Sequence, residues 1–197
     1  AGHLASRERQ PLEPVRAARP RPHRDEKILT AWNGMMIAAL AEVGQTLGEP
    51  RYVQAAERAG DLLWSRLRVA PGTLRRVLLD GRASLPALQE DYAFLGEGLV
   101  ALYDATGQRR WLERARELAD AMWTRFADLE SGGLFMAEPG DTPQMARPKD
   151  LGDGAMPSGT SAACPHVAAG AALLKAWYPA MTNTEMRQWI RDHCRDL

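Results

Sequence analysis

The sequence predicts an all-α protein in which two helical hairpins follow one another and a pair of helices ends the chain. Between residues 30 and 126, four segments carry apolar residues at helical spacing. The second two segments repeat the first two at a shift of 59 residues, which places Tyr52 on Trp111. A repeat of this length built from a helix, a turn and a helix is typical of an array of α-hairpins.

Each helix is bounded by residues that end helices. Residues 1–24 form an irregular Arg/Pro-rich lead-in, because four prolines exclude a long helix there. We expect helices at residues 30–47, 51–68, 88–106 and 110–126, which end at glycine or proline signals or before Gly132. An extended connection from Gly72 to Pro86 joins the two hairpins. The first helix carries a stripe of bulky apolar residues at helical spacing: Trp32, Met35, Met36, Ala39, Leu40, Val43 and Leu47.

The repeat superposes identical residues along its length. They pair as Leu40 with Leu99, Gly48 with Gly107, Arg51 with Arg110, Ala56 with Ala115, Asp61 with Asp120, Trp64 with Trp123 and Arg66 with Arg125. An array of hairpins buries its inner helices only where neighbouring hairpins flank them. Two hairpins alone leave apolar faces open, so we expect self-association through these faces.

The composition excludes several classes of partner. The 25 basic and 25 acidic residues cancel, which removes the electrostatic basis for binding nucleic acid or an anionic membrane. No apolar run approaches the ~20 residues of a membrane span. Two cysteines predict free thiols and a cytoplasmic protein. No metal cluster or phosphate loop is present, so no metal or cofactor is expected. The first residue is Ala1 and not methionine, which suggests a fragment or a processed product.

One stretch resembles a known family. The residues RPRPHRDEKILTAWNG from Arg19 to Gly34 resemble a stretch of the YyaL / spermatogenesis-associated protein 20 family, whose members carry a thioredoxin-like N-terminal domain. Further matches cover about residues 4–163 and include Asp91-Tyr92-Ala93, Gly132-Gly133-Leu134-Phe135, Arg147-Pro148-Lys149 and residues 153–159. Two departures are Glu26 within the usual Asp-Asp-Lys and Thr160 in place of an asparagine. The resemblance implies part of an (α/α) toroid of the six-hairpin glycosidase type, related to N-acylglucosamine 2-epimerases.

In a ring of hairpins, ligands bind near the helix N-termini and the loops before them. Carboxylates beside aromatic rings suit sugars, because rings stack on pyranose faces while carboxylates bond hydroxyls or act as acid and base. We predict Asp91 or Asp25 as the acid/base. The predicted substrate-binding residues are Trp32, Asn33, Lys27, Tyr92, Asp153 and Ser158. Taken singly, each has a structural alternative: helix-dipole stabilisation for Asp25, core packing for Trp32 and Tyr92, and solvation for Lys27.

A second resemblance begins at Ser158. The residues from Gly159 to Ala169 resemble the nucleophile region of subtilisin-like serine peptidases, with Ser161 as nucleophile and Pro165 four positions later. The usual glycine after His-Val-Ala is Ala169 here. None of the four histidines has the His-Gly-Thr context of a subtilase base, and no suitable aspartate turn or oxyanion asparagine is present. We therefore expect no peptidase activity from this chain alone.

The sequence predicts three regions and leaves three alternative hypotheses for the function. The regions are the lead-in at 1–24, the two hairpins at 25–157 and the subtilase-like segment at 158–197. The first hypothesis is a carbohydrate-binding or carbohydrate-modifying toroid module with weak or no activity alone. The second is a segment of a serine endopeptidase that lacks its Asp and His. The third is a non-catalytic helical scaffold.

Overall fold

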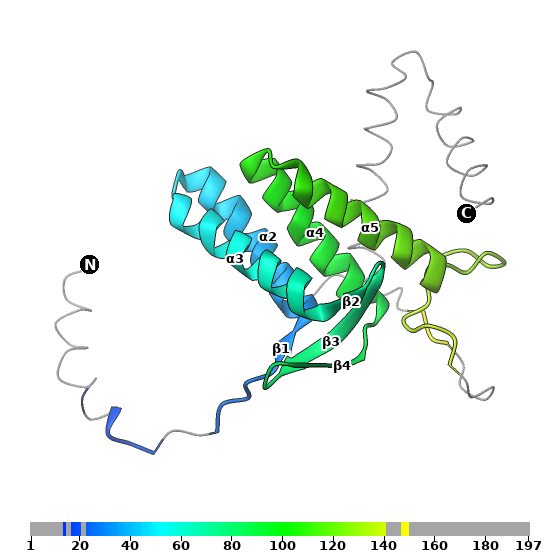
Figure 1. The fold of residues 1–197 in the computed structure, drawn as a ribbon, viewed down its shortest axis with the longest axis horizontal. Helices are drawn as coiled ribbons and strands as arrows, with labels where there is room; N and C mark the ends of the chain where they lie inside the picture. Colours follow the sequence, from blue (N-terminus) through cyan, green and yellow to red (C-terminus); the bar gives the residue numbers. More distant parts are fainter. Residues whose placement is uncertain (1–13, 15–16, 21–22, 141–146, 150–197) are drawn as a thin grey trace, which may run out of the picture.

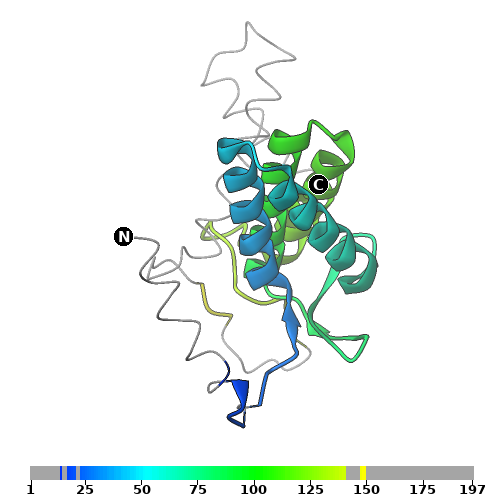
Figure 2. The ribbon, with the colours of Figure 1, turned by 90° about the vertical axis from the view of Figure 1, so that its left-hand side faces the viewer.

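The computed structural model describes residues 14, 17–20, 23–140 and 147–149. Within them, the helices lie side by side and a small sheet crosses one end of the helices (Figures 1 and 2). The helices are α2 (Thr30–Leu47), α3 (Pro50–Leu67), α4 (Gln89–Thr106) and α5 (Arg109–Phe126). The strands are β1 (Ile28–Leu29), β2 (Arg68–Ala70), β3 (Thr73–Leu79) and β4 (Arg82–Pro86).

The internal repeat is confirmed at the level of helix boundaries. The bounds of α2, 30 and 47, recur as 89 and 106 in α4, and the bounds of α3, 50 and 67, recur as 109 and 126 in α5. Both first helices end at a left-handed glycine: Gly48 has φ 64° and Gly107 has φ 66°. Glycine adopts this conformation without a Cβ penalty, which explains why the same residue ends both helices.

The first helix of each hairpin is an inner helix and the second is an outer one. The inner helices α2 and α4 pack against each other, and each also packs against its own hairpin partner. The outer helices α3 and α5 are amphipathic, with charged residues on the side away from the core. The core between them includes Ile37, Leu63, Leu99, Trp111 and Phe126, none of which is more than 1% exposed.

The segment that joins the two hairpins forms strands of a small sheet. Strand β3 pairs antiparallel with β1, β2 and β4, and the register places Ile28 opposite Leu78. The turn from β3 to β4 contains Asp80 with φ 50° and Gly81 with φ 74°. An Asp-Gly pair with positive φ at both residues is the favoured turn of a two-residue hairpin. The sequence therefore carried a hairpin signal at this position.

The buried face of α2 differs from its bulky apolar stripe. The helix buries Ala31, Gly34, Ile37, Ala38 and Ala41 against the rest of the protein. The exposed large side chains of this stripe are instead Trp32 (62%), Met36 (58%), Val43 (43%) and Leu47 (65%). Small residues allow the backbones of α2 and α4 to approach closely, and for this reason the side of α2 that packs against α4 carries mostly glycine and alanine. An apolar side of α2 is thus exposed, and self-association through it stays a prediction.

None of the helices described is both long enough and apolar enough to span a membrane.

Candidate functional site

Asp91 joins three elements at the N-terminal ends of the inner helices. Its side chain is 1% exposed and accepts hydrogen bonds from the backbone N–H of Leu88 (2.8 Å) and of Ala31 (3.0 Å). The Nη1 of Arg76 on β3 donates a third bond at 3.0 Å. Burial raises the pKa of Asp91, while these three donors oppose the rise. Both carboxylate oxygens are thus occupied by the protein itself.

Arg76 is shared between two carboxylates at the start of α4. Its Nη2 lies 2.7 Å from Oε1 of Glu90, in addition to the bond to Asp91. The side chains of Arg76 and Glu90 remain about a quarter to a third exposed (27% and 31%). This network fixes the sheet to the helix ends and neutralises the buried charge of Asp91.

Tyr92 lies in the core. The residue is 1% exposed, and its ring packs edge-on against Phe126 with ring centroids 5.4 Å apart. Its hydroxyl accepts a hydrogen bond from the Leu74 N–H (3.0 Å) and donates one to the carbonyl oxygen of Gly72 (3.2 Å). The ring of Tyr92 is therefore part of the core, as the structural alternative predicted. Its hydroxyl holds the turn between β2 and β3.

The remaining described candidates lie in the segment before α2 and in the first turn of α2. Trp32 is 62% exposed and Asn33 donates from Nδ2 to the carbonyl oxygen of Leu29 at 2.8 Å. Nζ of Lys27 lies 3.0 Å from Oδ2 of Asp25, and both side chains are exposed. The hydrogen bond from Lys27 lowers the pKa of Asp25 below its usual value, so this carboxylate is ionised at neutral pH.

The structure thus separates the candidates into two groups. Asp25, Lys27, Trp32 and Asn33 lie together in sequence at the start of α2, whereas Asp91 and Tyr92 are buried beneath this end. The predicted residues Asp153, Ser158 and Ser161 lie outside the described residues. In the described part of the chain, no group of three or more His, Cys, Asp or Glu side chains is arranged to hold a metal ion.

A loop after α5 contains an ion pair that sequence reasoning did not single out. Nζ of Lys149 contacts Oδ2 of Asp128 at 2.5 Å and donates to the carbonyl oxygen of Gly132 at 2.7 Å. Arg147 lies 4.0 Å over the ring of Phe135. Lys149 and the N–H groups of the Asp128 turn lower the pKa of Asp128 to about 2. Arg147 and Lys149 therefore hold the loop after α5 in place through these contacts.

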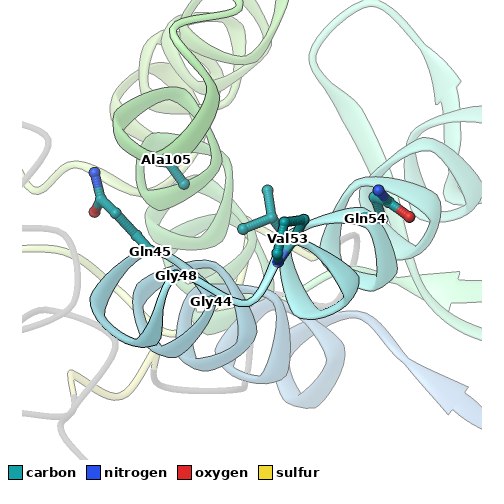
Figure 3. Close-up of a pocket in the computed structure, with 7 residues that line it drawn as sticks. Gly44, Gln45, Gly48, Val53, Gln54 and Ala105 are labelled. Atoms are coloured by element: carbon teal, nitrogen blue, oxygen red, sulfur yellow. The ribbon is translucent and has the colours of Figure 1, made fainter.

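The described pocket lies at the C-terminal end of α2, whereas these candidates lie at or before its start; Figure 3 shows the residues that line the pocket. It is a shallow groove of about 380 Å³ at the turn between α2 and α3. Apolar side chains and backbone make up most of its lining, with Gln45 and Gln54 as the polar side chains. Gln45 already donates to the carbonyl oxygen of Asp104 at 3.2 Å. This groove therefore offers few groups that would orient a polar ligand.

Comparison with known proteins supports both halves of the sequence analysis. Human spermatogenesis-associated protein 20 is 37% identical over 157 residues, which cover 75% of this chain and 20% of that protein. The rat protein of the same name is 38% identical over 157 residues, with the same coverage. The resemblance to this family is confirmed. The chain spans about a fifth of the length of the curated relatives it matches.

The C-terminal resemblance and the toroid are also supported. Residues 144–197 match the model of the subtilase family. Cellobiose 2-epimerase from Spirochaeta thermophila aligns with 82% of this chain and 41% of its own, with a TM-score of 0.56 and 21% sequence identity. This likeness shows a shared fold, and the described residues are mostly helical, forming part of an (α/α) toroid with a small added sheet.

Proposed function

We propose that this chain is a carbohydrate-binding or carbohydrate-modifying toroid module whose ligand contacts the start of α2. The observation that carries the proposal is the indole of Trp32, 62% exposed at the end of the helix where the charged side chains of Asp25 and Lys27 lie. An exposed tryptophan offers an apolar face with a polar edge, which suits the stacking of a pyranose ring. The likeness to a sugar epimerase supports the proposal as a fold-level analogy.

Each described candidate takes a role that its surroundings allow. Trp32 is the platform, while Asp25 and Lys27 bond sugar hydroxyls. Asp25 is ionised, so it acts as a base or an acceptor and not as an acid. Asp91 is a positioning residue, because its Oδ1 accepts a hydrogen bond from the backbone N–H of Ala31, next to Trp32. Two hairpins supply only part of a ring, so we expect weak binding by the chain alone.

Tryptophan fluorescence and ligand-observed NMR test this function. Mannose, N-acetylglucosamine and cellobiose are titrated into the whole chain up to high millimolar concentration. We expect saturable binding by at least one sugar that is lost in Trp32→Ala and weakened in Asp25→Asn. Trp123→Ala is the matched control, since Trp123 is a half-exposed tryptophan (39%) on the outer helix α5. Absence of saturable binding, or equal loss in both tryptophan variants, would refute the proposal.

A second candidate function is a serine-peptidase segment with Ser161 as nucleophile. The match of residues 144–197 to the subtilase family favours it. A serine becomes an effective nucleophile only with a base and an orienting acid, which we expect this chain to lack. Labelling by a fluorophosphonate probe that disappears in Ser161→Ala would support this function. If neither sugar binding nor labelling is observed, the non-catalytic helical scaffold is the remaining hypothesis.

A further inference from the structure

One side of α2 is both apolar and exposed. We define the α2 stripe as Met36, Ala39, Val43 and Leu47, all of them exposed. Their spacings of three, four and four residues place them on one side of the helix. A repeat that ends an array carries a polar outer face, because no further repeat covers it. The α2 stripe does not have the composition of such a face, since it is wholly apolar and Glu42 is the single charged residue of α2.

The internal repeat shows which kind of element fits this side of α2. A shift of 59 residues places the α2 stripe on Leu95, Gly98, Leu102 and Thr106 of α4. In α4 this side faces the first hairpin. A Cβ at Gly98 would lie 2.7 Å from the carbonyl oxygen of Gly34 in α2, and a Cβ at Gly60 in α3 would lie 3.2 Å from the side chain of Leu102. In the second copy of the repeat, the hairpin before it therefore covers this side.

The covering helix α2 runs parallel to α4. The N–H of Ala31 bonds Asp91 at 3.0 Å near the starts of the two helices, and Gln45 bonds the carbonyl oxygen of Asp104 at 3.2 Å near their ends. These contacts join start to start and end to end, so the helices point the same way. Where they approach most closely, α2 presents Gly34 to Gly98. A covering helix of this kind is therefore parallel and carries a small residue at the contact.

We propose that the α2 stripe is the docking surface for a further α-hairpin, whose inner helix runs parallel to α2 and presents a small residue to Ala39. This hairpin contacts the stripe in the way that α2 contacts α4. The curated relatives have enough length for such a hairpin, because this chain spans about a fifth of them. The docking surface does not depend on the proposed sugar site, since Trp32 is not part of the stripe.

A chain with one added repeat unit tests the proposal. A second copy of residues 30–88, inserted between Leu29 and Thr30, places an extra hairpin directly before the original α2. In the original α2, Met36→Cys reports on the stripe through its rate of labelling by a maleimide, measured by mass spectrometry. We expect the added copy to slow this labelling at least about tenfold. Leu129→Cys is the matched control, because Leu129 is 77% exposed in the loop after α5 and its labelling should not change.

A blocked copy tests the contact through the small residue. Gly34→Leu in the added copy alone places a bulky side chain against the stripe, so labelling of Met36→Cys should return to the rate in the unextended chain. Circular dichroism should show the same helix content in both extended chains. Unchanged labelling in the extended chain would overturn the proposal, and so would protection that survives in the blocked copy. Labelling of the unextended chain that slows as its concentration rises would overturn it in favour of a second copy as the occupant.

Discussion

Gly98 of α4 lies directly over Gly34 of α2. A Cβ at Gly98 would sit 2.7 Å from the carbonyl oxygen of Gly34, and a Cβ at Gly34 would sit 2.5 Å from the carbonyl carbon of Phe94. These neighbours are backbone atoms, which cannot turn aside as a side-chain tip can. The two glycines therefore set the distance between the inner helices.

Replacing either glycine by alanine should destabilise the protein. We expect Gly98→Ala and Gly34→Ala each to lower the free energy of unfolding in urea by about 1–3 kcal/mol, because the helices must separate to admit a methyl group. Gly60→Ala is the control: its Cβ would meet side-chain atoms of Leu102 and Trp111 at 3.2 Å, a contact that a shift of a few tenths of an ångström relieves. Equal effects in Gly60→Ala and Gly98→Ala would show that the close approach is unimportant.

Loss of the Asp91 carboxylate should be costly for stability. Asp91→Ala leaves the N–H groups of Leu88 and Ala31 without an acceptor and removes a partner of Arg76. We expect a loss of about 3 kcal/mol or more in urea unfolding. Glu90→Gln removes the other, part-exposed partner of Arg76 and should cost less than about 1 kcal/mol. If Asp91→Ala leaves the free energy of unfolding nearly unchanged, the carboxylate does not anchor the helix ends, and a role in catalysis would be favoured.

The ion pair of Asp128 and Lys149 should make stability depend on pH in the acid range. The pKa of Asp128 falls from its usual 3.8 to about 2 in the folded protein, so its contribution is present above pH 3.8 and is lost as the pH falls toward 2. Thermal unfolding of wild type and Asp128→Asn should differ by a constant amount above that range and converge below it. The difference in stability between wild type and Glu130→Gln should not vanish in this way. If the difference for Asp128→Asn also persists at low pH, the ion pair does not stabilise the protein.

Arg114 should stabilise the contact between the outer helices. Its guanidinium lies 4.8 Å from the ring of Trp111 and 5.1 Å from that of Trp64, and its Nη1 lies 2.7 Å from Asp61. We expect Arg114→Gln to lower the free energy of unfolding by about 1–2 kcal/mol. Arg116→Gln, whose side chain is 81% exposed, should change it by less than about 0.5 kcal/mol. A similar effect in both variants would show that stacking between the tryptophans contributes little.

The candidate site shows which features of a site can be predicted from sequence patterns. The sequence placed Asp91 and Tyr92 at the start of a helix, and both do lie there. Burial decides what they do, because the side chain of Asp91 bonds the backbone of Ala31, 60 residues away, and Tyr92 bonds the turn at Gly72. No local pattern encodes such contacts, since they depend on how distant segments meet. The roles of the exposed residues Asp25, Lys27 and Trp32 stay predictions until sugar binding is measured.

The sequence by itself determined the repeated helices and their ends, because helix periodicity and terminal glycines such as Gly48 and Gly107 act over a few residues. It also contained the Asp80-Gly81 hairpin signal. Only the tertiary structure decided which side of α2 is buried, because both sides are apolar and local periodicity cannot choose between them. The close approach of Gly34 to Gly98 made that choice, and it left the bulkier side of α2 facing outward.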